Sequence, residues 1–200
     1  MARLIILRHG NTFDKGDTPT RVGARTDLSL SVSGHMQAHS LATHFRDTVF
    51  RAAFCSPLLR TRQTARAVLD ARPHAPALRI LPFLTELDYG PDENQTEETV
   101  IARIGAEALA AWDRDATPPP DWQVDPAALR AAWASLVERA AELDADDTVL
   151  IVTSNGIARF LPDVVDGQPE GLDRKLKTGA WGVVDVGPDG TRIVDWNLRP

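Results

Sequence analysis

The stretch "VLIVTSNGIAR", residues 149–159, gives the clearest indication of the fold. It begins as a continuous run of apolar, largely β-branched residues, which is typical of a strand buried on both faces of a parallel sheet. The run ends abruptly in Ser154, Asn155 and Gly156. Open α/β sheets bind ligands at the carboxyl ends of their strands. These three residues are therefore expected to face a ligand or to cap a following helix.

Strand-like and helix-like segments alternate along the rest of the chain. The apolar segments expected to be strands are 3–7, 52–56 and 78–81, and helical patterns follow Ser31, cover 57–72 and 95–112, and resume after Asp125-Pro126. This alternation predicts an α/β fold, a three-layer α/β/α sandwich with a mainly parallel central sheet. Near the end, "WGVVDV" and "TRIVDW" flank a Gly-Pro-Asp-Gly turn, which predicts a C-terminal hairpin.

Composition narrows the class of protein. Two hundred residues that are 43% apolar predict a single domain, 1–200, with a helical cap region at about 91–145. A net charge of -6 argues against nucleic acid as a partner. One cysteine excludes an intrachain disulfide framework, and no signal-like or membrane-length apolar segment is present. We therefore expect a cytoplasmic protein that does not contact membranes, with a homodimer favoured only by base rates.

The first expected strand runs into Arg8, His9 and Gly10, so a cation, an imidazole and a flexible residue arrive together at a strand end. A histidine placed there could act as a nucleophile, a base or a metal ligand. The alternative is a histidine that only hydrogen-bonds backbone at the strand end. Because the sequence has no clustered Cys, His and Asp ligands, we expect no metal and no cofactor.

The second expected strand leads into "SPLLRTRQTA", residues 56–65. Arg60 lies in the first turn of the following helix, where a cation opposes the helix dipole but an anion is favoured. A bound phosphate would explain its position; the alternative is a solvated face of Arg60, Arg62 and Arg66. A cysteine-dependent phosphatase would need arginine where Thr61 stands, so Cys55 is expected to be a buried strand residue.

Four motifs together resemble those of the histidine phosphatase superfamily, also called the phosphoglycerate mutase-like family. They are "LRHGNT" at 7–12, "GARTDLSLSVSGHMQA" at 23–38, "SPLLRTRQTA" at 56–65 and "LTELDYG" at 84–90. Their order along the chain is that of the family, and the resemblance spans nearly the whole sequence.

The resemblance implies a phosphatase that transfers a phosphoryl group from a small phosphorylated substrate to His9. Arg8 and Arg60 would hold the phosphate oxygens, and Glu86 would give a proton to the leaving alcohol, because an alkoxide leaves poorly. Without the family match, Glu86 would be read as an exposed loop carboxylate.

The resemblance also marks a departure from the family. Its fourth strand ends in a pattern like V-[ST]-H-G-G-x-x-R, and alignment on Val152 and Arg159 puts Ser154 in the histidine slot. A serine can donate one neutral hydrogen bond but carries no positive charge, so slower turnover is expected. Asn155 could add its amide donors, and the backbone N–H groups of Asn155 and Gly156 could also bind the anion.

Other parts of the site are less constrained by the sequence. Asn11, Thr12 and Arg25 lie in or near the first two motifs and are candidate contacts to the rest of the substrate. Three alternatives stay open: a phosphoglycerate mutase-type phosphotransferase, a non-catalytic binder of a phosphorylated ligand, and an interaction protein on the same fold.

Overall fold

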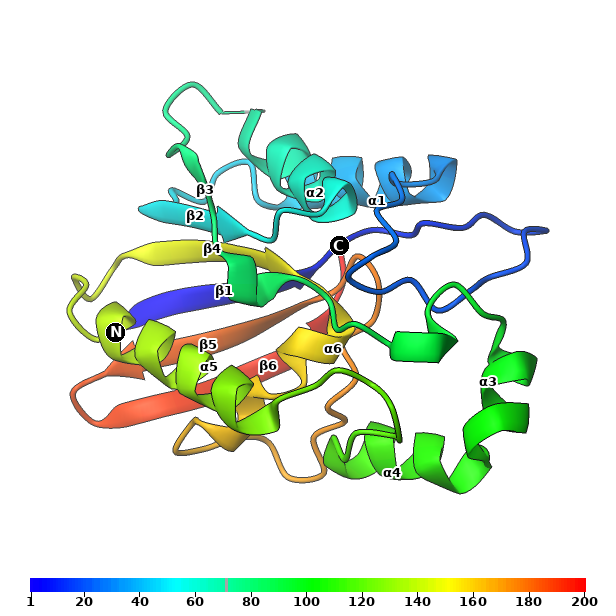
Figure 1. The fold of residues 1–200 in the computed structure, drawn as a ribbon. Helices are drawn as coiled ribbons and strands as arrows, with labels where there is room; N and C mark the ends of the chain where they lie inside the picture. The colour runs from blue at the N-terminus through cyan, green and yellow to red at the C-terminus, as the bar shows by residue number, and fades with distance from the viewer. Residues whose placement is uncertain (71) are drawn as a thin grey trace.

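The computed structural model of the chain describes residues 1–70 and 72–200. Its centre is a six-stranded sheet in the order β3-β2-β4-β1-β5-β6 (Figure 1). The strands are β1 (Ala2–Arg8), β2 (Ala52–Cys55), β3 (Leu78–Ile80), β4 (Thr148–Thr153), β5 (Trp181–Gly187) and β6 (Gly190–Leu198). The first four run parallel to one another, whereas β5 pairs antiparallel with β1 and β6 pairs antiparallel with β5. The predicted mainly parallel sheet with a C-terminal hairpin is confirmed.

The helices begin and end largely where the sequence indicates. They are α1 (Val32–His44), α2 (Leu59–Asp70), α3 (Glu97–Ile104), α4 (Ala106–Asp115), α5 (Pro126–Ala140) and α6 (Asn155–Ala158). Ser31 caps α1 by accepting the Gly34 N–H at 3.2 Å, and Asp125 caps α5. The single helix expected at 95–112 is divided by Gly105, whose φ of 83° favours glycine and breaks the helix between α3 and α4.

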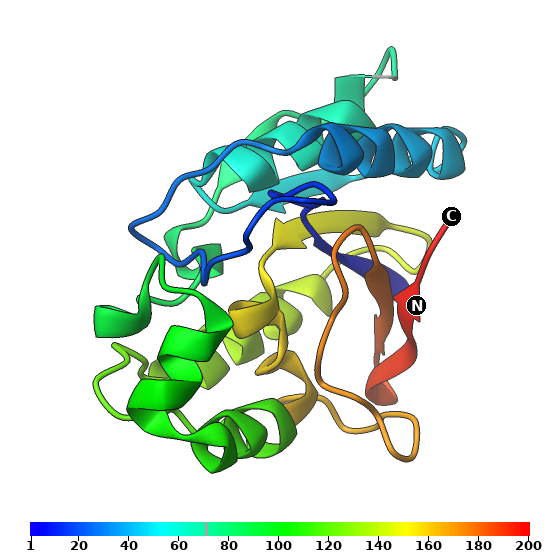
Figure 2. The same cartoon turned by 90° about the vertical axis from the view of Figure 1, so that its right-hand side faces the viewer.

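Alternation along the buried strands builds two apolar cores. Leu4 and Ile6 of β1 point into a core shared with Trp133 of α5, whereas Ile5 and Leu7 point into a core shared with α1 and α2. Figures 1 and 2 show α1 and α2 on one face of the sheet and α5 on the other. This arrangement is the predicted three-layer sandwich.

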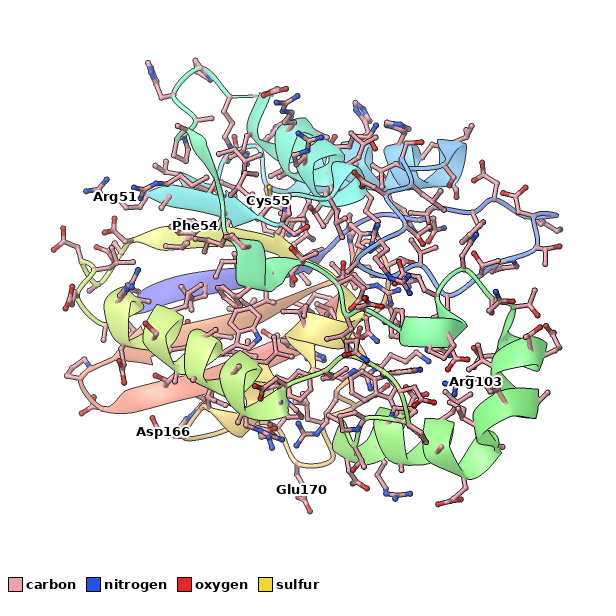
Figure 3. The ribbon with its side chains drawn as sticks, in the orientation of Figure 1. Arg51, Phe54, Cys55, Arg103, Asp166 and Glu170 are labelled. Carbon is pink, nitrogen blue, oxygen red and sulfur yellow. The ribbon has the colours of Figure 1, made fainter. Side chains whose placement is uncertain are left out.

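Within the expected cap region 91–145, α3 and α4 lie beyond the carboxyl ends of the parallel strands, whereas α5 covers the sheet (Figure 1). Asp92, which is 1% exposed, accepts hydrogen bonds from the Arg103 guanidinium at 2.6 Å and the Trp122 indole at 2.7 Å. Arg103 lies on α3 (Figure 3), so this carboxylate joins α3 to the 117–122 break. The ion pair therefore fixes α3 against the 117–122 segment.

Two further sequence expectations can be compared with the structure. Cys55 is fully buried between β2 and α2 (Figure 3), and burial raises the pKa of its thiol to about 11, as suits an inert strand residue. Across the described residues, the helices are too short or too polar to cross a bilayer.

Candidate active site

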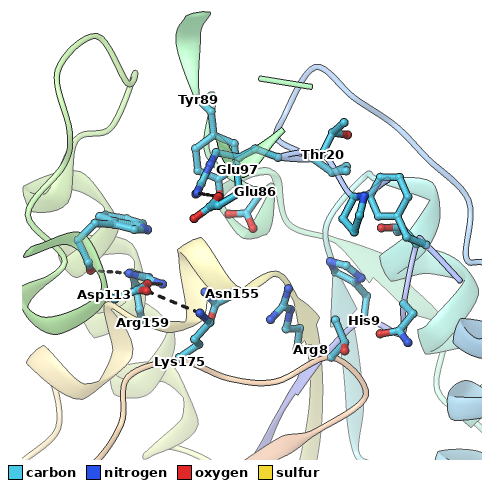
Figure 4. Close-up of a pocket in the computed structure, with 18 of the residues that line it drawn as sticks. Arg8, His9, Thr20, Glu86, Tyr89, Glu97, Asp113, Asn155, Arg159 and Lys175 are labelled. Atoms are coloured by element: carbon cyan, nitrogen blue, oxygen red, sulfur yellow. Dashed lines mark hydrogen bonds and ion pairs between the residues drawn. The ribbon is translucent and has the colours of Figure 1, made fainter. Parts of the chain in front are cut away.

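A cavity of about 560 Å³ opens at the carboxyl ends of β1 and β4 (Figure 4). Strand pairing ends with Arg8 opposite Thr153, so His9 and Ser154 leave the sheet side by side, and the His9 N–H donates to the Thr153 carbonyl at 3.1 Å. The parallel register thus brings together two motifs that are far apart in sequence, as strand ends do in α/β folds.

His9 lines this cavity and is only 5% exposed. Its Nδ1 donates to the Gly10 carbonyl oxygen at 2.7 Å, which leaves the lone pair on Nε2. Burial, followed by the positive charges of Arg60 and Arg8, lowers the pKa of the imidazole well below its usual 6.5. His9 is therefore neutral at pH 7 and carries a free nitrogen lone pair, which is what a nucleophile needs.

Gly10 permits the approach of α1 that supports this histidine. A Cβ at Gly10 would lie 2.6 Å from the Gly34 carbonyl oxygen, closer than such atoms can pack. The Gly10 N–H donates to the Thr64 hydroxyl at 3.2 Å. The strand end that carries His9 is thus held by both α1 and α2.

Arg8 and Asn155 line the cavity and are tied to the same backbone segment. Arg8 Nη1 donates to the Leu176 carbonyl at 2.8 Å, and the Leu176 N–H donates to Asn155 Oδ1 at 2.9 Å. Because its oxygen is engaged, the Asn155 side chain offers its Nδ2 donors to the cavity.

Arg60 is completely buried and does not line the cavity. Its guanidinium donates to the carbonyls of Thr26 at 2.9 Å and Gly23 at 3.2 Å. The alternative of a solvated arginine is therefore wrong for Arg60. Its charge still acts on His9 through the pKa, and its contact with a phosphate stays a prediction.

Glu86 also lines the cavity and is 6% exposed, so the reading as an exposed loop carboxylate is wrong. Its carboxylate accepts the Leu87 N–H at 2.9 Å and the Gly156 N–H at 3.3 Å. A Cβ on Gly156 would overlap the Glu86 carboxylate, so any other residue at this position would displace that carboxylate. The Gly156 N–H is occupied by the Glu86 carboxylate, so it is not free to bind a phosphate as the sequence suggests.

Ser154 is fully buried and precedes α6, yet its hydroxyl does not cap this helix. Within the part of the chain that the structure describes, the Ser154 hydroxyl finds no hydrogen-bond partner. The interpretation of this side chain as a helix cap is therefore wrong. Buried hydroxyls nearly always have a partner, so this one is exceptional.

The three candidate substrate contacts have different positions. Asn11 and Thr12 line the cavity, with Asn11 Nδ2 donating to the Ser33 hydroxyl at 3.2 Å. Arg25 lies outside it and pairs with Asp88 at 3.0 Å and Glu93 at 3.5 Å. Those ion pairs hold the 23–27 loop, so the substrate contact predicted for Arg25 finds no support in its position.

The sequence motifs give few indications of the residues on the far side of the cavity. Residues there include Arg21, Tyr89, Trp112, Asp113, Arg159 and Lys175. They come from loops and cap helices, where periodicity carries little information. One signal was available: Arg159 follows Asn155 by four residues and therefore lies near it on the same turn.

Residues 4–199 match the model of the histidine phosphatase superfamily, branch 1, over almost the entire chain. The chain belongs to this superfamily. Within residues 1–70 and 72–200 of this histidine phosphatase family member, no group of three or more His, Cys, Asp or Glu side chains could hold a metal ion.

Other members of the superfamily are similar over most of their length. The adenosylcobalamin/alpha-ribazole phosphatase of Salmonella typhimurium is 28% identical, with 92% of this chain and 90% of that protein covered. The 2,3-bisphosphoglycerate-dependent phosphoglycerate mutase 2 of Gloeobacter violaceus is 27% identical, with 87% and 80% covered.

Solved structures agree on the fold. A putative alpha-ribazole-5'-P phosphatase from Escherichia coli superposes with a TM-score of 0.76 at 25% identity, covering 99% of this chain and 97% of that one. A mycobacterial glucosyl-3-phosphoglycerate phosphatase gives 0.78 at 22% identity, with 98% of each chain covered. A phosphatase or mutase-type enzyme is therefore the class that these relatives support.

Proposed function

We propose that this protein hydrolyses a phosphomonoester through a phosphohistidine on His9. The observation that carries the proposal is the hydrogen bond from His9 Nδ1 to the Gly10 carbonyl, which leaves Nε2 as the free nucleophile beside Arg8. The lowered pKa keeps this nitrogen unprotonated. Catalysis of phosphoryl transfer depends mostly on positioning the reactants and stabilising charge. His9 and Arg8, which would serve these two purposes, lie together at the end of β1.

In the first step, Nε2 of His9 forms a bond to phosphorus while the bond from phosphorus to the ester oxygen breaks. Glu86 gives its proton to that oxygen, so the leaving group departs as a neutral alcohol. Arg8 and the Asn155 amide donate to the phosphoryl oxygens as charge shifts onto them. The N–H groups of Leu87 and Gly156 position the Glu86 carboxyl group for this transfer.

In the second step, water attacks phosphorus and the bond to Nε2 breaks. The Glu86 carboxylate takes the proton from this water, which restores the acid and releases inorganic phosphate. His9 returns to its neutral form, because the electron pair of the broken N–P bond stays on Nε2. No metal or cofactor is needed to balance either step.

We further propose that Ser154 stands where other family members carry a second imidazole. Its buried hydroxyl without a partner supports this placement, since a phosphoryl oxygen could accept its hydrogen bond. A neutral donor in place of a charged one costs transition-state stabilisation of about 2–4 kcal/mol. Turnover is then slow but not lost.

The same observation at Ser154 favours one alternative function, a protein that binds a phosphorylated ligand without turning it over. A mutase is the other alternative, and the Gloeobacter violaceus relative favours it. Transfer of phosphate from 2,3-bisphosphoglycerate to a monophosphoglycerate, without release of inorganic phosphate, would identify the mutase.

The deciding experiment is a single turnover with a radiolabelled aryl phosphate at mildly acidic pH, followed by trapping of acid-labile, alkali-stable phosphate on the protein. We expect label on the wild type and on His39→Ala, a control on the exposed face of α1, and none on His9→Ala. Ser154→His should react faster. Absence of label on the wild type, with phosphate still bound, would support the binder.

A further inference from the structure

Arg159 is a buried cation that the proposed reaction does not use. It is 1% exposed, lines the cavity, and has its guanidinium 4.0 Å from the centre of the Trp112 ring. Nη1 donates to the Trp112 carbonyl at 2.5 Å, and Nε has no partner among the described residues. Buried charges are normally paired, so this guanidinium is under-compensated.

The only acid that pairs with Arg159 among the described residues is Asp113, at 3.4 Å. Asp113 is itself 52% exposed and also contacts Lys175, with 3.6 Å between its Oδ2 and Nζ. Two cations thus share one half-exposed carboxylate. By contrast, Arg21 at the same cavity has Glu97 as a partner at 2.5 Å. The group of Arg159, Asp113 and Lys175 therefore carries one excess positive charge.

The excess positive charge of this group lies where the non-reacting part of a substrate would extend. Figure 4 shows Asp113, Arg159 and Lys175 on one side of the cavity and His9 on the other, with Arg8 and Asn155 between them. A phosphoryl group at His9 and Arg8 would leave the remainder of the substrate to extend toward Lys175. The cavity of about 560 Å³ has room for such a substrate.

We propose that Arg159 and Lys175 form a second anion subsite, and that Asp113 occupies it in the absence of substrate. The preferred substrates are then phosphomonoesters that carry a second anionic group, a carboxylate or another phosphate, on the leaving alcohol. This inference rests on the proposed function. It assigns Lys175 and Asp113 as specificity-determining residues, and they do not take part in the chemical steps.

A purely architectural role for Arg159 explains only part of the arrangement. Its bond to the Trp112 carbonyl and its stacking on the indole do join α6 to the cap helix α4. Lys175, however, is 51% exposed, and its ammonium contacts Asp113 alone among the described acids. A half-exposed ion pair of this kind contributes little to stability, so stability does not account for a second cation beside Arg159 at the cavity.

The test measures binding, so that it does not depend on turnover. The probes are phosphonates joined through two to five methylenes to a carboxylate, to the neutral amide of the same shape, or to a second phosphonate. Dissociation constants are measured by calorimetry at pH 7.5. For at least one chain length, the wild type should bind the carboxylate or the bisphosphonate about tenfold more tightly than the amide. Whichever of these two probes binds more tightly identifies the anionic group that the subsite prefers.

Two variants assign this preference to residues. Lys175→Met should weaken binding of the anionic probe about five- to tenfold and leave the amide unchanged. Asp113→Asn should strengthen binding of the anionic probe several-fold, because the competing carboxylate is removed. Asp115→Asn, two residues further along α4 and paired with Arg114, is the matched control and should change neither. All three side chains are half-exposed or more, so the variants should fold.

The outcomes separate this inference from the proposed reaction. Equal affinity for amide and anionic probes at every length, or equal effects of Lys175→Met on both, would overturn the second anion subsite. If the protein prefers the anionic probe but forms no phosphohistidine, the proposed reaction is wrong and the second anion subsite stands.

Discussion

The Gly156 N–H donates to the Glu86 carboxylate at 3.3 Å, across 70 residues of sequence. A methyl group at Gly156 would overlap this carboxylate and contact the Leu87 side chain at 2.9 Å. Gly156→Ala should therefore displace Glu86 and reduce kcat about tenfold to hundredfold for alkyl phosphates. With nitrophenyl phosphate, whose leaving group needs no proton, the loss should be much smaller.

The control for this variant is Gly167→Ala, at a glycine outside the cavity where the added carbon would meet only the flexible Arg192 side chain, at 3.3 Å. It should leave the ratio of the two rates unchanged. An equal loss with both esters in Gly156→Ala would show that Glu86 is not the proton donor.

His9 links stability to pH. Its pKa is lower in the folded protein than its usual 6.5, so below pH 6.5 the unfolded chain binds the proton first. The free energy of unfolding should therefore fall as the solution is acidified, by up to about 1.4 kcal/mol per pH unit, until the lowered folded pKa is reached. Urea unfolding between pH 7 and 5 should show a shallower fall in His9→Gln than in His39→Gln. Identical slopes would contradict the buried, neutral imidazole.

Asp92 should matter for the cap. Burial alone would raise the pKa of this carboxyl. Hydrogen bonds from the Arg103 guanidinium and the Trp122 indole outweigh burial and lower the pKa. Asp92→Asn leaves Arg103 without its buried partner and should cost about 3 kcal/mol of unfolding free energy. Asp121→Asn removes the exposed ion pair of the same arginine and should cost less than about 1 kcal/mol. Chemical denaturation measures both.

Asp14 caps the start of α1 from the preceding loop, accepting the Ser33 N–H at 2.8 Å and the Val32 N–H at 3.0 Å. Hydrogen bonds from Ser33, with smaller contributions from Ser31 and Val32, lower its pKa from 3.8 to about 2. The stabilisation is present above pH 3.8 and lost as pH falls through about 2. Asp14→Asn should lower Tm at pH 7, and its difference from the wild type should shrink as pH falls from 4 toward 2. A constant difference would contradict the charged cap.

Most of the helices and strands, and the end of the cavity that carries His9, can be predicted from the sequence; the division of the expected 95–112 helix into α3 and α4 is an exception. The continuous apolar runs of β1 and β4 identify the buried strands, because burial on two faces leaves no room for polar residues. Ser31 and Asp125 mark helix starts through local hydrogen bonds. The motif with His9 lies at a strand end, so its position follows from chain order.

Which side chains share the cavity depends on the packing of the folded chain. Arg60 faces the backbone of the 23–26 loop, the Gly156 N–H faces Glu86, and the Ser154 hydroxyl faces no partner among the described residues. Asp113, Arg159 and Lys175 meet from α4, the end of α6 and a loop. These relationships depend on how elements distant in sequence pack against each other, and local propensity and periodicity contain no information about such packing.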